Sequence, residues 1–336
     1  MASDEFSLIR SWTSRSQGQE GDGLTVGIGD DAAVFSVSAE MEVVVCCDAM
    51  VETVHFLRET MKPEDIGYKA VISNISDVAA MGGIARYALV SIAVPPKWSE
   101  GECEAVYKGI YEACEAYGIR LIGGDTVSAP DALHLSVTLL GEVERGKALR
   151  RTAARPGQLV FVTGHLGGSA AGLHVLLDNR DAGAGVSEEW RPLVTMHQRP
   201  SAQITAGRLL LAAGGTGALN DVSDGLASEL WEIAEASGVT LVIKASAIPI
   251  AEATRKYGEK VGKDPLHWAL FGGEDYQLVG TVDEAVSESL ALRFADSGVP
   301  FTVIGRVEEG KPFVWMHTDQ ERVPLHKAGF NHFQRR

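Results

Sequence analysis

The chain has 336 residues, of which 45% are hydrophobic and 22% are charged, so it can bury full cores and does not belong to the disordered class. Its length favours two domains. The formal net charge of -15 argues against sequence-independent nucleic-acid binding, which needs a basic face. An acidic protein that handles phosphates must instead bring metal ions to them.

The cysteines and the N-terminal residues indicate the compartment. Cys46, Cys47, Cys103 and Cys114 form no C-x-x-C pair, and the histidines show no H-E-x-x-H spacing, so a zinc site is not indicated. This pattern fits a reducing compartment. Residues 1–20 lack the apolar segment of a secretory signal, and no apolar run approaches the length of a membrane span. We therefore expect a cytoplasmic protein that does not act in a membrane.

The first half of the chain mixes strands with helices. Pro63 suits the first position of a helix, and Glu64 and Asp65 favour its positively charged N-terminus, whereas Gly82-Gly83 ends it. In chain order we predict a strand over 42–48, a helix over 63–81, a strand over 87–94, an amphipathic helix over 99–117 and a strand over 133–143.

A basic segment over 145–157, ending in Pro-Gly, predicts a domain boundary. We place it between an N-terminal domain of residues 1–147 and a C-terminal domain of residues 148–336. In the second half we predict a strand over 158–163, helices from about 170, near 200–213 and over 225–237, strands over 239–244 and 276–282, a helix over 284–297 and a strand over 301–307. This alternation predicts an α/β (α+β) fold.

Six short motifs pair an acid with glycine or another small residue. They are Gly29-Asp30-Asp31, Cys47-Asp48, Asn74-Ile75-Ser76-Asp77, Gly123-Gly124-Asp125-Thr126, Asp221-Val222-Ser223-Asp224-Gly225 and Gly272-Gly273-Glu274-Asp275. Any one of them is equally typical of an ordinary turn. Glycine also lets the backbone approach a ligand, and clustered carboxylates need cations to offset their repulsion. Together the motifs predict a site for several Mg²⁺ ions and a polyphosphate.

The predicted helix over 63–81 carries the most informative of these motifs. The helix is apolar over much of its surface, yet Asn74 and Asp77 share one of its faces. A buried carboxylate is costly unless it is paired or binds a metal ion. The alternative is a structural Asp77 that pairs with a nearby lysine or arginine.

Two glycine-rich segments and several single residues leave alternatives open. The segment 141–147 has Walker-like spacing, but Ala148 follows it without a hydroxyl for Mg²⁺, so we interpret it as a turn. We interpret the loop over 164–169 as a tight strand–helix turn, and an anion site formed by its backbone N–H groups is the alternative. Arg151 is either a solvated linker charge or a phosphate contact. His55 is equally consistent with packing and with a ligand contact.

Taken in order along the chain, the motifs resemble those of the thiamine-monophosphate kinase family. The resemblance is carried by 27–33, 48–56, 74–82, 123–126, 223–226 and 272–276, and it covers roughly residues 5–333. The related aminoimidazole-ribonucleotide synthetases, selenophosphate synthetases and hydrogenase-maturation enzymes share the architecture but not this combination of motifs.

The resemblance implies a two-domain aminoimidazole-ribonucleotide synthetase-like fold. In it the N-terminal sheet pairs with its copy in a homodimer, and the C-terminal domain completes a cleft for ATP and Mg²⁺. The implied reaction is in-line transfer of the ATP γ-phosphoryl group to thiamine monophosphate, which gives thiamine diphosphate and ADP. K⁺ stays open as a further ion.

The resemblance also assigns roles to residues. The residues implied to bind Mg²⁺ are Asp31, Asp48, Asp77, Asp125 and Asp221, and Asp224 is implied to bind a further ion. The residues implied to contact ATP are Tyr107, Gly124, Asp125, Arg151 and Ser223. The residues implied to contact thiamine phosphate are His55, Glu274 and Phe330. Of these, Asp31, Asp48, Asp77, Asp125 and Arg151 are the implied catalytic residues.

Two departures from the family pattern bear on these roles. Cys46 and Cys47 stand where hydroxyl residues are usual, and since a thiol is a poor Mg²⁺ ligand, any metal contact there comes from a backbone carbonyl or a water. Thr53 stands where glycine is common. Two other functions remain as alternatives, an ATP-dependent ring-closing synthetase of the same architecture and a non-catalytic nucleotide-binding dimer.

Overall fold

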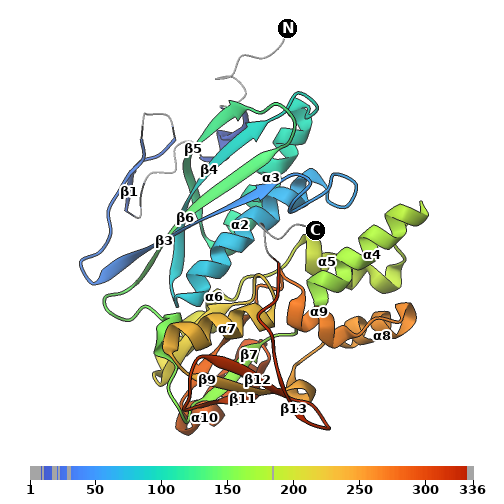
Figure 1. The fold of residues 1–336 in the computed structure, drawn as a ribbon. Coiled ribbons are helices and arrows are strands. Elements are labelled where there is room, and N and C mark those ends of the chain that lie inside the picture. Colours follow the sequence, from blue (N-terminus) through green and yellow to red (C-terminus); the bar gives the residue numbers. More distant parts are fainter. Residues whose placement is uncertain are drawn as a thin grey trace. The chain divides into compact units, whose positions relative to one another are not determined.

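The structure is a computed structural model that describes residues 9, 11–16, 21, 23–28, 32–183 and 185–330, with Asp181 described by its backbone alone. These residues divide into two compact units (Figure 1). Unit 1 comprises Met1–Val78 and Gly83–Gly146, and unit 2 comprises Ala79–Gly82 and Lys147–Arg336. Each unit is described by itself below.

The described part of unit 1 forms a four-stranded sheet in the order β3-β6-β4-β5. The strands are β3 (Met41–Val51), β4 (Ile84–Val94), β5 (Arg120–Ser128) and β6 (His134–Glu144), and only the β4–β5 pair is parallel. Helices α2 (Pro63–Ala80) and α3 (Glu100–Tyr117) lie against one face of this sheet (Figure 1). A short ribbon of β1 (Leu24–Val26) and β2 (Val34–Phe35) and a 3-10 turn, η1 (Ser14–Ser16), precede it.

Two glycines allow α2 and α3 to pack closely. A Cβ atom added at Gly67 would lie 2.0 Å from the Val106 carbonyl oxygen, and one added at Gly109 would lie 1.8 Å from the Glu64 carbonyl oxygen. Ser99 caps α3 in a capping box with Glu102, which satisfies backbone N–H groups of the first turn.

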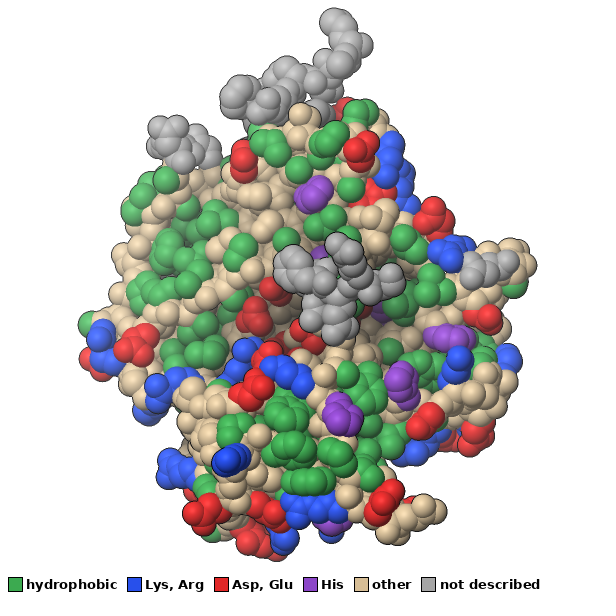
Figure 2. All heavy atoms as spheres, viewed as in Figure 1, with side chains coloured by type: hydrophobic (Ala, Val, Ile, Leu, Met, Phe, Trp, Pro, Cys, Tyr) green, Lys and Arg blue, Asp and Glu red, His purple; other side chains and the backbone are tan. Residues whose placement is uncertain are grey.

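The other face of the unit 1 sheet is covered in part by the β1–β2 ribbon, where Leu24 and Phe35 pack against Tyr87, and elsewhere it carries exposed apolar side chains. Along β6 alternate residues such as Leu135, Val137 and Leu139 are buried, as period-two alternation requires. On the edge strand β3, Val43 and Val45 are 48% and 63% exposed. Figure 2 shows hydrophobic side chains gathered on the part of the surface formed by unit 1.

The described part of unit 2 forms a seven-stranded sheet in the order β13-β12-β9-β11-β7-β10-β8. Its strands are β7 (Leu159–Thr163), β8 (Thr216–Asp221), β9 (Thr240–Lys244), β10 (Leu278–Val282), β11 (Phe301–Glu308), β12 (Phe313–His317) and β13 (Arg322–Pro324). Its helices are α4 (Gly168–Ala182), α5 (Arg191–Gln198), α6 (Ile204–Ala213), α7 (Leu226–Ser237), α8 (Glu252–Val261), α9 (Pro265–Phe271) and α10 (Glu284–Ser297), with 3-10 turns η2 (Arg151–Ala153), η3 (Glu188–Trp190) and η4 (Ala245–Ala247).

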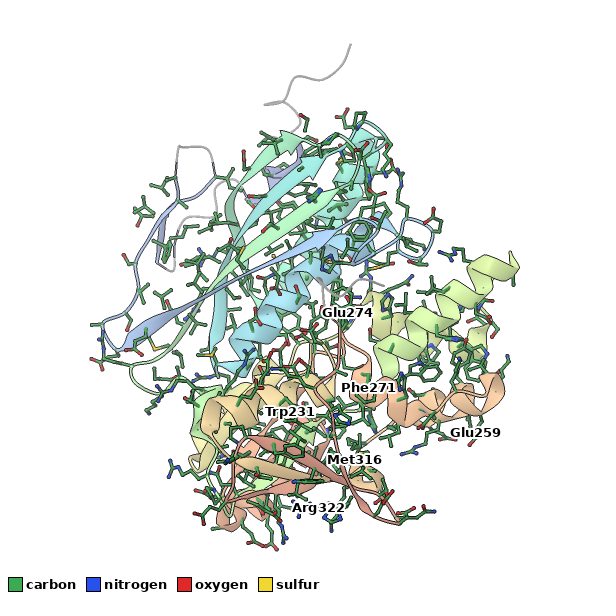
Figure 3. All side chains as sticks on the ribbon, in the orientation of Figure 1. Trp231, Glu259, Phe271, Glu274, Met316 and Arg322 are labelled. Atoms are coloured by element: carbon green, nitrogen blue, oxygen red, sulfur yellow. The ribbon has the colours of Figure 1, made fainter. Side chains whose placement is uncertain are left out.

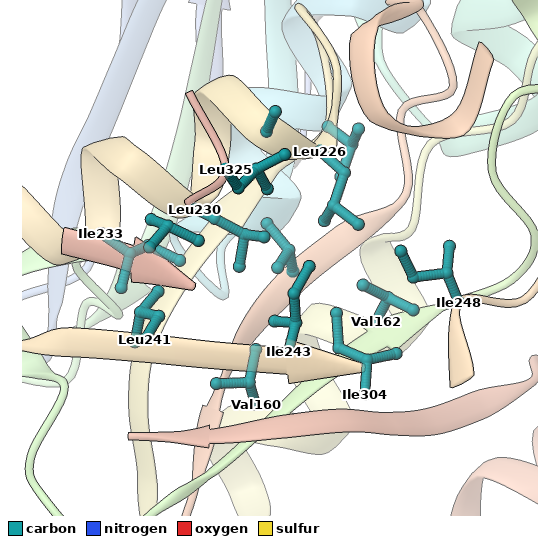
Figure 4. Packing of buried hydrophobic residues seen from close by; sticks show 14 of the residues in the cluster. Val160, Val162, Leu226, Leu230, Ile233, Leu241, Ile243, Ile248, Ile304 and Leu325 are labelled. Carbon is teal, nitrogen blue, oxygen red and sulfur yellow. The ribbon is translucent and has the colours of Figure 1, made fainter. Parts of the chain in front are cut away.

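Helices cover both faces of the unit 2 sheet. On one face Val160 and Val162 of β7 pack in a core with Leu230 of α7 (Figure 4). On the other face Phe161 joins a second core with Phe294 of α10. Because alternate residues of one strand enter two different cores, β7 is the centre of a three-layer arrangement.

The structure confirms the mixed α/β class and most of the predicted elements, and it corrects several details. The predicted strand over 42–48 extends over β3, and the predicted helix near 200–213 begins only at Ile204. The strands β1, β2, β5, β8, β12 and β13 and the helices α5, α8 and α9 were not predicted. Strand β5 was missed because Gly123-Gly124 lies in its middle and is typical of a turn. Within the described chain no helix combines the length and apolarity that crossing a bilayer requires.

Candidate functional site

In unit 1, strand β3 and helix α2 bring two of the motifs together. The side chain of Asn74 accepts a hydrogen bond from the Asp48 backbone N–H over 3.0 Å and donates one to the Ala70 carbonyl over 3.0 Å. Asn74 is fully buried, so both hydrogen bonds are formed away from water. Asn74 therefore acts as a spacer that fixes Asp48 against the helix that carries Asp77.

The two cysteines beside Asp48 face opposite ways, as alternation along a strand requires. The Cys46 thiol donates to the Asn74 carbonyl over 3.3 Å, and its pKa is raised because of burial and the nearby charges of Asp77 and Asp48. The Cys47 thiol lies 3.4 Å from Ser136 Oγ on the other face of the sheet. The Cys46 thiol therefore faces α2, and the Cys47 thiol faces the opposite side of the sheet.

Among the carboxylates of unit 1, Asp48 has the surroundings that best support a role in binding a cation. Its side chain retains an exposed surface, but loss of hydration raises its pKa, while a hydrogen bond from Ser73 and the nearby His55 oppose the shift. His55 also accepts the Val51 backbone N–H at Nδ1 over 3.0 Å. A carboxylate that is disfavoured in its charged form is one that a cation would stabilise.

The Gly123-Gly124-Asp125-Thr126 motif lies on β5, so it is a strand rather than a turn. A Cβ atom added at Gly124 would lie 1.9 Å from the Val90 carbonyl oxygen, so the neighbouring strand already requires glycine there. Asp125 is exposed, and its Oδ1 atom accepts the Thr126 backbone N–H over 3.0 Å. Tyr107 is buried, and burial raises its pKa to about 12, although a hydrogen bond with Thr126 lowers it. Tyr107 therefore contacts the residue that directly follows Asp125 in the sequence.

In unit 2 the end of β8 carries a compact acidic network. Asn220 donates through Nδ2 to the carboxylates of Glu229 and Glu232, and Arg151 Nε donates to Asn220 Oδ1 over 2.8 Å. An Arg151 guanidinium nitrogen lies 3.0 Å from Glu232 Oε2. Glu229 Oε1 accepts the Asp224 backbone N–H over 3.1 Å. Arg151 is therefore fixed next to the Asp221 motif, and its side chain is half exposed.

Glu229 was not singled out in the sequence, although it lies at the centre of this network. It is 2% exposed, and its pKa is raised to about 9 because of burial and the neighbouring carboxylates of Glu232 and Asp221. Its spacing on α7 gives no signal, because a glutamate in the first turn of a helix is ordinary.

Three segments distant in sequence meet at the loop that follows β8. The Glu274 backbone N–H donates to the Ser223 carbonyl over 2.7 Å, and the Phe330 backbone N–H donates to the Asp224 carbonyl over 3.3 Å. Glu274 follows the end of α9 and is labelled near Phe271 in Figure 3. Phe330 is 37% exposed. The structure therefore brings Ser223, Asp224, Glu274 and Phe330 together within unit 2.

The loop over 164–169 binds an anion that the protein itself supplies. Asp275 accepts backbone N–H groups of Gly167 over 2.6 Å and of Ser169 over 3.1 Å at the N-terminus of α4. Burial raises the pKa of Asp275 to about 7, and these hydrogen bonds oppose the shift. The loop is thus a strand–helix turn closed by Asp275, which leaves its N–H groups occupied.

The described residues hold only part of the expected site. Asp31 lies outside the described residues. Among the residues that are described, no three His, Cys, Asp or Glu side chains form a ready-made metal centre. The acidic motifs are instead present as a set around Asp48 in unit 1 and a set around Asp221 in unit 2.

Comparisons with known proteins place the chain in a family. The family models of the AIR synthase related protein match residues 29–143 for its N-terminal domain and residues 155–317 for its C-terminal domain. The thiamine-monophosphate kinase of Bacillus subtilis is 47% identical over 332 residues, which cover 98% of this chain and all of the relative. The chain belongs to the thiamine-monophosphate kinase family.

Solved structures agree with this assignment. The thiamine-monophosphate kinase from Stenotrophomonas maltophilia superimposes with a TM-score of 0.81 at 35% identity, covering 96% of this chain and 98% of that one. AaThiL complexed with AMPPCP and TMP superimposes with a TM-score of 0.78 at 34% identity, covering 98% of this chain and 97% of that one. The resemblance seen in the motifs and the expected aminoimidazole-ribonucleotide synthetase-like architecture are confirmed.

Proposed function

We propose that this member of the family phosphorylates thiamine monophosphate with ATP and releases thiamine diphosphate and ADP. The observation that carries the proposal is the meeting of the Ser223-Asp224, Glu274 and Phe330 segments at one loop, in a chain nearly half identical to a thiamine-monophosphate kinase. A relative of known structure carries an ATP analogue and TMP, which supports the same pair of substrates here.

The acidic residues suit a reaction between two anions. The terminal phosphate of thiamine monophosphate attacks the γ-phosphoryl group in line, so catalysis consists mainly of positioning and charge neutralisation. The residues that would hold Mg²⁺ are Asp31, Asp48, Asp77, Asp125, Asp221 and Asp224. Magnesium would supply the positive charge that the acidic chain lacks. The half-exposed Arg151, already oriented by Asn220, adds a fixed cation for a phosphate of ATP.

The remaining assignments concern the nucleotide and the acceptor. Tyr107 and Gly124 belong to the segment around Asp125, and Ser223 precedes Asp224, so we assign these three to ATP. Glu274 offers a carboxylate to the cationic thiamine, and the exposed Phe330 ring offers an aromatic surface. His55, close to Asp48, is assigned to the acceptor phosphate. The proposal includes K⁺ as a further ion of the site.

A homodimer through unit 1 is part of the proposal. Edge strands with exposed apolar side chains favour pairing, and Val43 and Val45 of β3 and Val127 of β5 are all about half exposed or more. The use of ATP and the spacing of the cysteines make the cytoplasm the proposed location.

The test is direct turnover. Purified protein with ATP, Mg²⁺ and thiamine monophosphate should form thiamine diphosphate and ADP in equal amounts, measured by chromatography. Asp77→Asn should nearly abolish turnover with an unchanged melting curve, because it preserves shape and removes the charge. Asp131→Asn, an exposed acid of unit 1 outside the motifs, is the matched control and should be fully active. ATP consumption without thiamine diphosphate would refute the proposal.

A further inference from the structure

A buried histidine on α5 lies beside the acceptor candidate Glu274. His197 is 2% exposed, and its Nδ1 atom lies 3.1 Å from Ser169 Oγ and 3.5 Å from Glu274 Oε2. Helix α5 carries none of the motifs on which the proposed function is built. His197 is therefore a polar group that the proposed chemistry has not used.

Ser169 links His197 to the residue next to Glu274. The Ser169 backbone N–H donates to Asp275 Oδ1 over 3.1 Å, while its hydroxyl contacts His197. Two successive carboxylates are thus held by two helices, Asp275 by the N-terminus of α4 and Glu274 by His197 of α5. Glycines on the other side leave little room for the segment to shift, since a Cβ atom at Gly273 would lie 2.4 Å from the Ser223 carbonyl oxygen.

The backbone at this point is strained. Glu274 has φ 65° and Tyr276 has φ 50°, in the left-handed region that side-chain-bearing residues seldom occupy. Such conformations persist when surrounding contacts impose them, and they gather at ligand sites. The Glu274 side chain faces His197 and is 28% exposed, so a ligand can reach it.

We propose that His197 is a positioning residue that holds the Glu274 carboxylate in the orientation that binds the cationic thiamine part of the acceptor. The inference rests on the proposed function, because Glu274 must contact the acceptor for its orientation to matter. It adds a specificity-determining residue from an element that contains no acidic motif.

The hydrogen-bonding chemistry sets the state of the imidazole. An ionised carboxylate only accepts hydrogen bonds, so His197 must present N–H at Nδ1 to bind Glu274. In that tautomer the Ser169 hydroxyl, 3.1 Å from the same nitrogen, is an acceptor of the N–H as well. One ring nitrogen thereby connects the serine at the start of α4 to the strained glutamate.

The test separates the N–H group from the imidazole ring. His197→Asn retains an N–H donor near the Nδ1 position, whereas His197→Leu removes it and fills much of the volume. His197→Leu should raise the KM for thiamine monophosphate about tenfold, as expected for a hydrogen bond to a charged group. The KM for ATP should change less than about twofold, and His197→Asn should restore the acceptor KM to within about twofold of wild type.

His174 offers a matched control. It lies on α4 and its Nδ1 atom forms a 3.0 Å hydrogen bond with the Tyr257 hydroxyl, with no part in the Glu274 contacts described above. His174→Leu should leave the ratio of the two KM values unchanged even where it lowers the melting temperature. Should His197→Leu fail to fold, His197→Gln takes its place, because its amide reaches the Nε2 position and leaves Nδ1 without a substitute.

A double-mutant cycle with Glu274→Gln completes the experiment. If His197 acts through Glu274, His197→Leu should change the acceptor KM by less than about twofold when Glu274 is already Gln. Equal rises in both KM values, an unchanged acceptor KM, or full additivity with Glu274→Gln would overturn the inference. Failure of the proposed function would look different, because wild-type protein would then form no thiamine diphosphate.

Discussion

Replacing Glu229 with Gln should make the stability of the metal-free protein less sensitive to pH. Burial, followed by the carboxylates of Glu232 and Asp221, raises the Glu229 pKa from 4.5 to about 9. Between these values the folded protein binds a proton that the unfolded chain has released. The free energy of unfolding therefore falls as pH rises through this window, and the full loss is reached above about pH 9.

The size of the effect follows from the pKa values. Each unit of pKa difference corresponds to about 1.4 kcal/mol. Between about pH 5 and about pH 7 the free energy of unfolding should therefore fall by up to about 3 kcal/mol because of Glu229. Gln has nearly the shape of the protonated acid, still accepts the Asp224 N–H and does not titrate, and the cost of placing its amide nitrogen opposite Asn220 Nδ2 does not depend on pH. Relative to wild type, Glu229→Gln should therefore gain stability steadily as pH rises.

The assay is urea unfolding of both proteins in EDTA at several pH values. Asp275, whose pKa is also raised to about 7, titrates in both proteins, so the difference between them isolates Glu229. Added Mg²⁺ should reduce the difference, because a cation near Asp221 and Asp224 favours the ionised form of Glu229. A stability difference that stays constant from about pH 5 to about pH 9 would refute the reasoning, since Glu229 would then titrate as an ordinary glutamate.

Three further substitutions test separate parts of the structure. Cys47→Ser should be tolerated or mildly activating, because the thiol faces Ser136 and Thr138, and a large rise in the Mg²⁺ concentration for half-maximal rate would contradict this. Gly109→Ala should lower the free energy of unfolding by about 1–3 kcal/mol, since its Cβ meets backbone, whereas Gly101→Ala on the same helix has open space and should not destabilise, as urea titrations would show. Phe330→Ala should raise the KM for thiamine monophosphate well above any change in the KM for ATP, and equal changes in steady-state assays would remove Phe330 from the acceptor pocket.

The elements that the sequence predicted well are those with strong local signals. Helix α2 begins at Pro63 and ends near Gly82-Gly83, and α3 carries a complete capping box at Ser99. Strand β5 was missed because a glycine pair is typical of a turn. Here Gly123 and Gly124 are required by the close approach of Leu89 and Val90 on β4. A local pattern cannot show a requirement that a neighbouring strand imposes.

The same limit applies to the candidate site. The acidic motifs made Asp48, Asp221 and Asp224 candidates, because acids beside small residues at element ends are visible in the sequence. Asn220 and Glu229 were missed, because their importance lies in contacts between β8, α7 and η2.

The strained residues show where local sequence preference and the folded structure disagree. Thr53, noted because glycine is common at its position, has φ 73°, and such a conformation costs a residue with a Cβ about 1–3 kcal/mol. Glu274 has φ 65° with no sequence signal, since glutamate is not a residue of left-handed turns. The contacts that impose this conformation come from Ser223 and from His197, which are 51 and 77 residues away by their numbers. Formation of the turn does not explain why a glutamate stands here, because a glycine would form the same turn without the strain. The strain is explained more simply by the orientation that the Glu274 carboxylate must have in the site.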